Sequence, residues 1–217
     1  GSLLPVDSHG DPVYPLITWM DGRTEELVRE WRALGKGEQI KTISGWTLKT
    51  GQCLPTIAWL RDNDPEVFNA AAHYFSVNDF LAYRLTGQYC SNPSNAGGMQ
   101  MVDIQTGGWS QPLCNLSGIS VLQLSQIQPS GAIIGKITNE VSEKTGLSPQ
   151  TLLVNGGHDQ GIAALGLGVN SPGKYLLACG TAWVISGIMS SIEVGGVPSV
   201  LDWNTHPLGD RWIISQS

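Results

Sequence analysis

The stretch Val154-Asn-Gly-Gly-His-Asp-Gln-Gly-Ile-Ala-Ala-Leu-Gly-Leu-Gly168, with Lys174-Tyr-Leu-Leu-Ala-Cys-Gly-Thr-Ala-Trp183 after it, decides most of what this sequence says about its fold. The first segment places an acid, Asp159, after a short apolar run and a glycine pair. The second sets the turn Gly180-Thr181 after another apolar run. An acid and a phosphate-sized turn at two strand ends favour phosphoryl transfer.

The residue types at these two turns suit that chemistry. Transfer of a phosphoryl group to an alcohol needs a base for the hydroxyl proton, and Asp159 is the candidate. Gly180 has no Cβ, so its backbone can approach a phosphate, and the hydroxyl of Thr181 can donate a further hydrogen bond. The alternative interpretation makes Asp159 the cap of a helix that begins near Gly161. Both interpretations remain open at this point.

Six segments spread along the chain stand out as motifs: Trp19-Met-Asp-Gly-Arg-Thr24, Ile57-Ala-Trp-Leu-Arg-Asp-Asn63, Ser76-Val-Asn-Asp-Phe-Leu-Ala-Tyr-Arg-Leu-Thr-Gly87, Cys90-Ser-Asn-Pro-Ser-Asn-Ala96, Gly156-Gly-His-Asp-Gln160 and Gly180-Thr-Ala182. A single short motif carries little weight, whereas six in one order are specific. Together they resemble the FGGY carbohydrate kinases, and the likeness extends along nearly the whole chain. The match is closest to the xylulokinase-like members, which implies a ketopentose such as xylulose as substrate, with gluconate and related polyols behind it.

The sequence departs from the family pattern in two ways. Thr56 stands where the family signature has a Lys, and Cys53 replaces a small hydroxyl residue or Pro, which puts substrate contacts of that loop in doubt. An Asp-x-Gly-Thr phosphate loop does not precede Leu3, and no adenosine-binding domain follows Thr181 before the sequence ends at Ser217. We therefore expect an internal fragment of a longer kinase, inactive in isolation.

Strand and helix patterns alternate along the chain, which argues for an α/β protein. The resemblance implies the ribonuclease-H-like, actin-like ATPase fold. It also implies that residues 1–169 form most of the N-terminal, sugar-binding domain without its first strands. Residues 170–217 are expected to begin the C-terminal, nucleotide-binding domain.

Local patterns predict the individual elements. Caps, proline and glycine positions predict helices over 24–34, 65–72 (with Asp64 as cap), 76–85 and 139–145. Apolar runs predict strands over 15–19, 131–137, 152–155, 174–179 and 183–189. Residues 91–98, with Asn92-Pro93 and Gly97-Gly98, are expected to form turns.

Composition narrows the possible partners. The 217 residues carry 12 Lys and Arg against 18 Asp and Glu, a net charge of −6, which gives no reason to expect nucleic acid or an anionic membrane. The four cysteines form no C-x-x-C pair, so neither a metal site nor a disulfide framework is indicated, and a reduced cytoplasmic setting is expected. The expected partners are a sugar and ATP, and homodimerisation is left open.

Several other residues can serve either in a site or in packing. Trp19 resembles the family's sugar-pocket Trp, and the indole can stack on the C–H faces of a polyol. Gln160 can bind a substrate hydroxyl, or can be a plain first-turn residue. His158 is expected to be structural, because adjacent His and Asp side chains usually point apart in a strand or turn. Asp21 and Arg23 are expected to form a local pair.

The sequence is compatible with three functions. The first is an ATP-dependent sugar kinase in which Asp159 is the base and Thr181 helps to hold the phosphates with Mg²⁺. The second is a non-catalytic sugar-binding module or pseudokinase. The third, a metal-dependent hydrolase using His158, Asp159 and either His73 or His206, lacks the usual ligand spacings.

Asn95 is expected to form a turn, with a lesser chance of lining the pocket.

Overall fold

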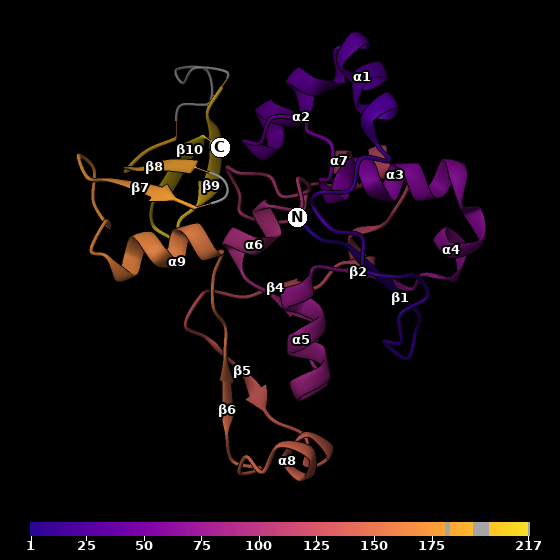
Figure 1. The fold of residues 1–217 in the computed structure, drawn as a ribbon, viewed down its shortest axis with the longest axis vertical. Coiled ribbons are helices and arrows are strands. Elements are labelled where there is room, and N and C mark those ends of the chain that lie inside the picture. The colour runs from indigo at the N-terminus through magenta and orange to yellow at the C-terminus, as the bar shows by residue number, and fades with distance from the viewer. Residues whose placement is uncertain (181–182, 193–199, 217) are drawn as a thin grey trace.

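We describe the protein from a computed structural model, which covers residues 1–180, 183–192 and 200–216. Helices α1 to α4, within residues 25–70, lie on one side of the molecule and a four-stranded sheet lies on the other, with α6 (Pro93–Gly97) between them (Figure 1). Strands β5 (Ile133–Lys136) and β6 (Leu152–Val154) project from this body and carry α8 (Asn139–Thr145) at their far end (Figure 1). No described helix is long and apolar enough to cross a membrane.

The N-terminal helices surround the largest apolar core. Trp31, Leu54, Ile57 and Met101 are among its buried side chains, and burying each contributes roughly 1.5–3 kcal/mol. The elements of this part are β1 (Leu4–Val6), α1 (Glu25–Ala33), α2 (Lys36–Ser44), α3 (Cys53–Asn63), α4 (Pro65–Ala70), β2 (His73–Phe75) and α7 (Gln111–Ser117).

The middle of the chain builds a second layer around helix α5 (Val77–Thr86). Ser76 caps this helix and Gly87 ends it in the left-handed conformation. The other elements here are β3 (Cys90–Ser91), α6 (Pro93–Gly97), the 3₁₀ turn η1 (Val121–Gln123), β4 (Gln126–Ile127), β5 (Ile133–Lys136), α8 (Asn139–Thr145) and β6 (Leu152–Val154). Strand β3 pairs in parallel with β4, while β5 pairs antiparallel with β6.

The C-terminal part is an antiparallel sheet with α9 (Asp159–Gly166) packed on it. Its strands are β7 (Tyr175–Cys179), β8 (Trp183–Met189), β9 (Asp202–Thr205) and β10 (Trp212–Gln216), in the order β7-β8-β10-β9. Ala164 of α9 shares a small apolar core with Ile188 and Ile213 of the sheet. This packing fixes the helix that begins at Asp159.

Most of the predicted elements are confirmed, with α1, α4, α5, α8, β5, β6, β7 and β8 lying within a few residues of their expected bounds. The strand expected over residues 15–19 is wrong. Only Ile17 pairs there, with Leu3, and Pro15 has no N–H with which to extend a ladder.

The turn expected over residues 91–98 is wrong in part. It contains the end of β3 and the short helix α6, because Asn92 caps the first turn and Pro93 occupies the position after the cap.

Candidate active site

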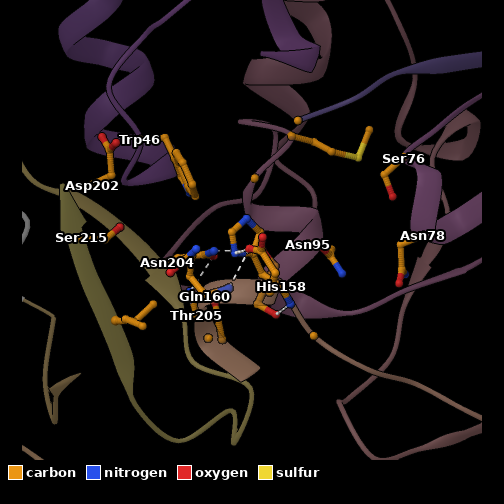
Figure 2. Close-up of a pocket in the computed structure, with 18 of the residues that line it drawn as sticks. Trp46, Ser76, Asn78, Asn95, His158, Gln160, Asp202, Asn204, Thr205 and Ser215 are labelled. Atoms are coloured by element: carbon orange, nitrogen blue, oxygen red, sulfur yellow. Dashed lines mark hydrogen bonds and ion pairs between the residues drawn. The ribbon is translucent and has the colours of Figure 1, made fainter. Parts of the chain in front are cut away.

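A cavity of about 770 Å³ lies between α6, the start of α9 and the four-stranded sheet. This size suits a small-molecule ligand. Figure 2 shows the polar side chains that converge on it. Its walls include Trp19, Trp46, Gln52, Ser76, Asn78, Ser94, Asn95, His158, Asp159, Gln160, Ser186, Asp202, Asn204 and Ser215.

A short loop after β6 leads to the acid. Asn155 begins this loop and is buried, and its amide donates to the backbone oxygens of Ser91 (3.0 Å) and Gln128 (2.9 Å). Gly157 follows at a close approach, because a Cβ there would lie 2.9 Å from Cδ1 of Ile162. The loop is therefore pinned at its start, and a side chain at residue 157 would require Ile162 to shift.

Asp159 is the first residue of α9, and its side chain is 81% exposed. Its carboxylate accepts a hydrogen bond from the N–H of Gln160 at 2.7 Å. The helix begins at residue 159, not near Gly161, and His158 takes the cap position without a side-chain hydrogen bond. The carboxylate lies at the positive end of the helix dipole and faces the cavity.

His158 was expected to point away from Asp159, and this is wrong. Its Nδ1 lies 3.0 Å from Oδ1 of Asp159. The two residues span the change from irregular loop to helix, so the alternation that separates neighbours in a strand does not apply. Burial lowers the pKa of His158 against the opposing effect of Asp159, so the imidazole that faces the carboxylate is neutral at pH 7.

Trp19, Gln160 and Asn95 line the same cavity as Asp159. Trp19 is 60% exposed, and its carbonyl lies where a Cβ on Gly51 would be 2.0 Å away, so glycine at 51 permits this placement. The Oε1 atom of Gln160 is buried and accepts no hydrogen bond from the described residues. Asn95 also stabilises its own turn, since its N–H donates to Oδ1 of Asn92.

The candidate phosphate turn stands apart from this group. Gly180 follows β7 and is exposed, and it does not line the cavity. Thr181 lies outside the described residues. The cavity reaches the same sheet through Val184 and Ser186 of the adjacent strand β8.

Asp21 and Arg23 form the expected pair, with Nε of Arg23 2.8 Å from Oδ1 of Asp21. The guanidinium also lies over the rings of Tyr14 and Trp59, which indicates a structural role.

The two distant histidines weighed for a metal site do not join His158. His73 packs between Phe75 and Tyr89, and Nδ1 of His206 accepts from the N–H of Leu208. Within residues 1–180, 183–192 and 200–216, no group of three His, Cys, Asp or Glu side chains is placed to hold a metal ion.

Several cavity residues were missed by the sequence analysis. Asp202 accepts hydrogen bonds from the N–H of Thr47 (2.8 Å) and from Lys49 (2.9 Å), which fixes β9 against the loop that carries Trp46. Asn204 follows on the same strand, β9, and its amide donates to the backbone oxygen of Ser94 in α6. No local motif marks these residues, because they meet only through tertiary packing.

Known proteins resemble this chain over most of its length. Autoinducer-2 kinase of Yersinia enterocolitica is 32% identical over 180 residues, which cover 82% of this chain and 34% of that protein. Autoinducer-2 kinase of Salmonella choleraesuis is 29% identical over 185 residues, covering 84% and 34%. The chain therefore spans about a third of the length of these curated relatives.

Solved structures agree on the fold. A ligand-bound xylulose kinase of Lactobacillus acidophilus superposes with a TM-score of 0.93 at 22% identity, over 99% of this chain and 43% of that one. A gluconate kinase of the same species gives 0.92 at 23% identity, again over 99% and 43%. The expected mixed α/β, actin-like ATPase fold is confirmed.

The family itself follows from the sequence match. The N-terminal domain of the FGGY family of carbohydrate kinases matches residues 1–166, which include Trp19, Asp159 and Gln160. This chain belongs to the FGGY family of carbohydrate kinases.

Proposed function

We propose that this protein serves the ATP-dependent phosphorylation of a sugar hydroxyl, with Asp159 as general base. One observation carries the proposal: an exposed carboxylate at the start of a helix faces a cavity of about 770 Å³ whose walls are rich in amide and hydroxyl groups. The carboxylate is held close to its backbone by its contacts with Gln160 and His158, while its outer face stays open to an acceptor.

The chemistry follows from this placement. Asp159 accepts the proton of the acceptor hydroxyl while the oxygen of that hydroxyl forms a bond to the γ-phosphorus of ATP. The bond from this phosphorus to the β,γ-bridging oxygen breaks, and ADP leaves. Because His158 is neutral, it orients the carboxylate of Asp159 without placing a positive charge beside it that would lower its basicity. The start of α9 stabilises the carboxylate before the proton arrives.

We place the nucleotide phosphates beside the cavity, at the end of β7. The exposed Gly180 at the end of β7 offers a backbone free of Cβ, which fits a phosphate. We assign the contact through a hydroxyl to Thr181. Mg²⁺, when bound with ATP, supplies charge neutralisation for the transferring phosphoryl group.

The acceptor is a neutral polyhydroxy compound in this proposal. Gln160, Asn95, Asn78 and Asn204 line the cavity, and an amide can both donate to and accept from a hydroxyl. Trp19 offers an exposed indole to the C–H face of a sugar. A ketopentose such as xylulose fits this lining. Autoinducer-2 is the second candidate, favoured by the relatives at 29–32% identity.

The experiment tests the base and the acceptor together in the complete kinase. We expect Asp159→Asn to lower kcat at least ~10²-fold and to leave the sugar Kd within a few-fold, since a general base acts on the transition state. Turnover is measured on xylulose, autoinducer-2, gluconate and glycerol.

Glu140→Gln is the matched control, because Glu140 is a first-turn acid of α8 outside the cavity. Its kcat should stay within twofold of the unmodified enzyme. Near-normal turnover of Asp159→Asn would return Asp159 to a structural role, and sugar binding without turnover by the unmodified protein would favour the pseudokinase alternative.

A further inference from the structure

The direction of the Asp159 side chain depends on the backbone just before it. The side-chain contacts of Asp159 are with its own neighbours, His158 and Gln160. Neither contact ties the carboxylate to another element of the fold. The position of the carboxylate therefore follows the position of the backbone at residue 158.

One buried hydroxyl holds that backbone. The N–H of His158 donates to Oγ of Ser94 at 2.9 Å, and Oγ of Ser94 donates to Oδ1 of Asn92 at 2.8 Å. Ser94 is 1% exposed and Asn92 is fully buried. Because the hydroxyl proton is committed to Asn92, the oxygen of Ser94 is left with its lone pairs toward His158.

Helix α6, which carries Ser94, is itself fixed on the sheet. The amide of Asn204 on β9 donates to the backbone oxygen of Ser94 at 2.9 Å. The fit is close, since a Cβ on Gly97 would lie 2.2 Å from Oδ1 of Asn204. Residue 94 thus joins the loop before α9, helix α6 and strand β9. Figure 2 labels Asn204 and His158, one on each of the two segments that Ser94 contacts.

We propose that Ser94 is a positioning residue that sets the direction of the Asp159 carboxylate through the backbone of His158. This inference rests on the proposed function of Asp159. Loss of the hydroxyl leaves the part-buried N–H of His158 without its partner and releases the end of the loop. Small displacements of a reacting group lower turnover strongly, whereas sugar binding depends on other walls of the cavity.

The test uses Ser94→Ala in the complete kinase. We expect kcat to fall about 10- to 100-fold while the KM for the sugar stays within threefold. Ser94→Cys keeps the volume and weakens the hydrogen bond, so it should give an intermediate kcat, and it carries the test if Ser94→Ala does not fold. Ser125→Ala is the control: Ser125 is 1% exposed, its hydroxyl has no partner among the described residues, and it lies outside the cavity. Its kcat should stay within twofold.

The double variant Ser94→Ala, Asp159→Asn separates positioning from a merely structural role. If Ser94 acts through Asp159, the double variant is no slower than Asp159→Asn alone. Equal losses in both backgrounds, or a Ser94→Ala enzyme with kcat within twofold of normal, would overturn the inference. If Asp159→Asn itself retains turnover, the proposed function fails, and this outcome differs from a failure of Ser94 alone.

Discussion

The base end of the cavity and the sheet end beside it, which is β7 with Gly180 after it and lies outside the cavity, are held in different ways. Around Asp159, buried amides and a hydroxyl fix the backbone through hydrogen bonds of Asn155, Ser94 and Asn204. At the sheet end, β7 is an edge strand. Leu176 on its inner face packs toward α9, while Leu177 on the opposite face is 55% exposed.

The difference follows from what each end has to place. A general base must lie within hydrogen-bonding distance of one proton, and directional polar contacts restrict it to one position. Apolar packing on a single face holds a whole strand in place, but it is not directional and does not orient an individual side chain. The outer face of β7 and β8, with Tyr175 and Trp183 exposed, leaves that end held from one side in the described residues.

The strongest way to break this comparison is to assay residues 1–217 alone. We expect no sugar-dependent ATP consumption, while the complete kinase is active, because transfer needs the nucleotide phosphates clamped and in line before the base can act. Coupled-enzyme detection of ADP is the measurement. Robust turnover by the 217 residues would mean that a full nucleotide site lies within them.

A paired stability measurement sharpens the comparison. Asn155→Ala removes the amide that donates to the backbone oxygens of Ser91 and Gln128, although the oxygen of Ser91 keeps the N–H of Gln128 as a second donor, and we expect it to lower the free energy of unfolding by about 1–3 kcal/mol. Leu177→Ala changes an exposed face and should cost less than ~0.5–1 kcal/mol. Urea unfolding of the 217-residue chain followed by tryptophan fluorescence gives both values. Similar losses would mean that the two ends are equally fixed.

Asp79 adds a pH dependence to the polar side of the cavity. It is buried beside the cavity residue Asn78 and completes the cap of α5 by accepting from the N–H of Ser76. Burial raises the pKa of Asp79 to about 6 from 3.8. The folded state therefore holds the proton more tightly than the unfolded state, so this contribution to stability is full below pH 3.8 and is lost as the pH rises through 6.

Asp79→Asn should remove this contribution while keeping an acceptor for Ser76. Between pH 4.5 and 7, titration of Asp79 is expected to lower the free energy of unfolding of the unmodified chain by about 2 kcal/mol, a loss that the variant does not show. The measurement is the difference between the two proteins in unfolding free energy at each pH. Parallel pH profiles would mean that Asp79 titrates as an exposed carboxyl does.

The smallest expected effect concerns the sheet end. Thr181→Val keeps the volume and removes one hydroxyl, so we expect the KM for ATP to rise about three- to tenfold with the KM for the sugar unchanged. Thr181→Ser retains the hydroxyl and should restore the KM for ATP. A larger rise for the sugar than for ATP would move Thr181 to the sugar side of the cavity.

Local sequence rules were enough for the well-capped elements. Ser76 and Gly87 bound α5 as predicted, and Thr138 and Gly146 bound α8, because caps act within one turn of the backbone. The same rules missed α6, which is five residues long and contains glycine at its end, so its helicity depends on its contacts with other elements.

The sequence by itself determined the family, the well-capped helices and the candidate acid, because motif residues and their spacing lie along the chain, whereas α2, α3, α7, β9 and β10 were not predicted. The tertiary structure decided that Trp19, Asp159 and Gln160 share one cavity, and it added Trp46 and Asp202 from distant segments. It also decided that His158 turns toward Asp159 and that Ser94 accepts a hydrogen bond from the backbone N–H of His158. Hydrogen bonds between residues far apart in sequence depend on how the elements pack, and a local pattern carries no information about that packing.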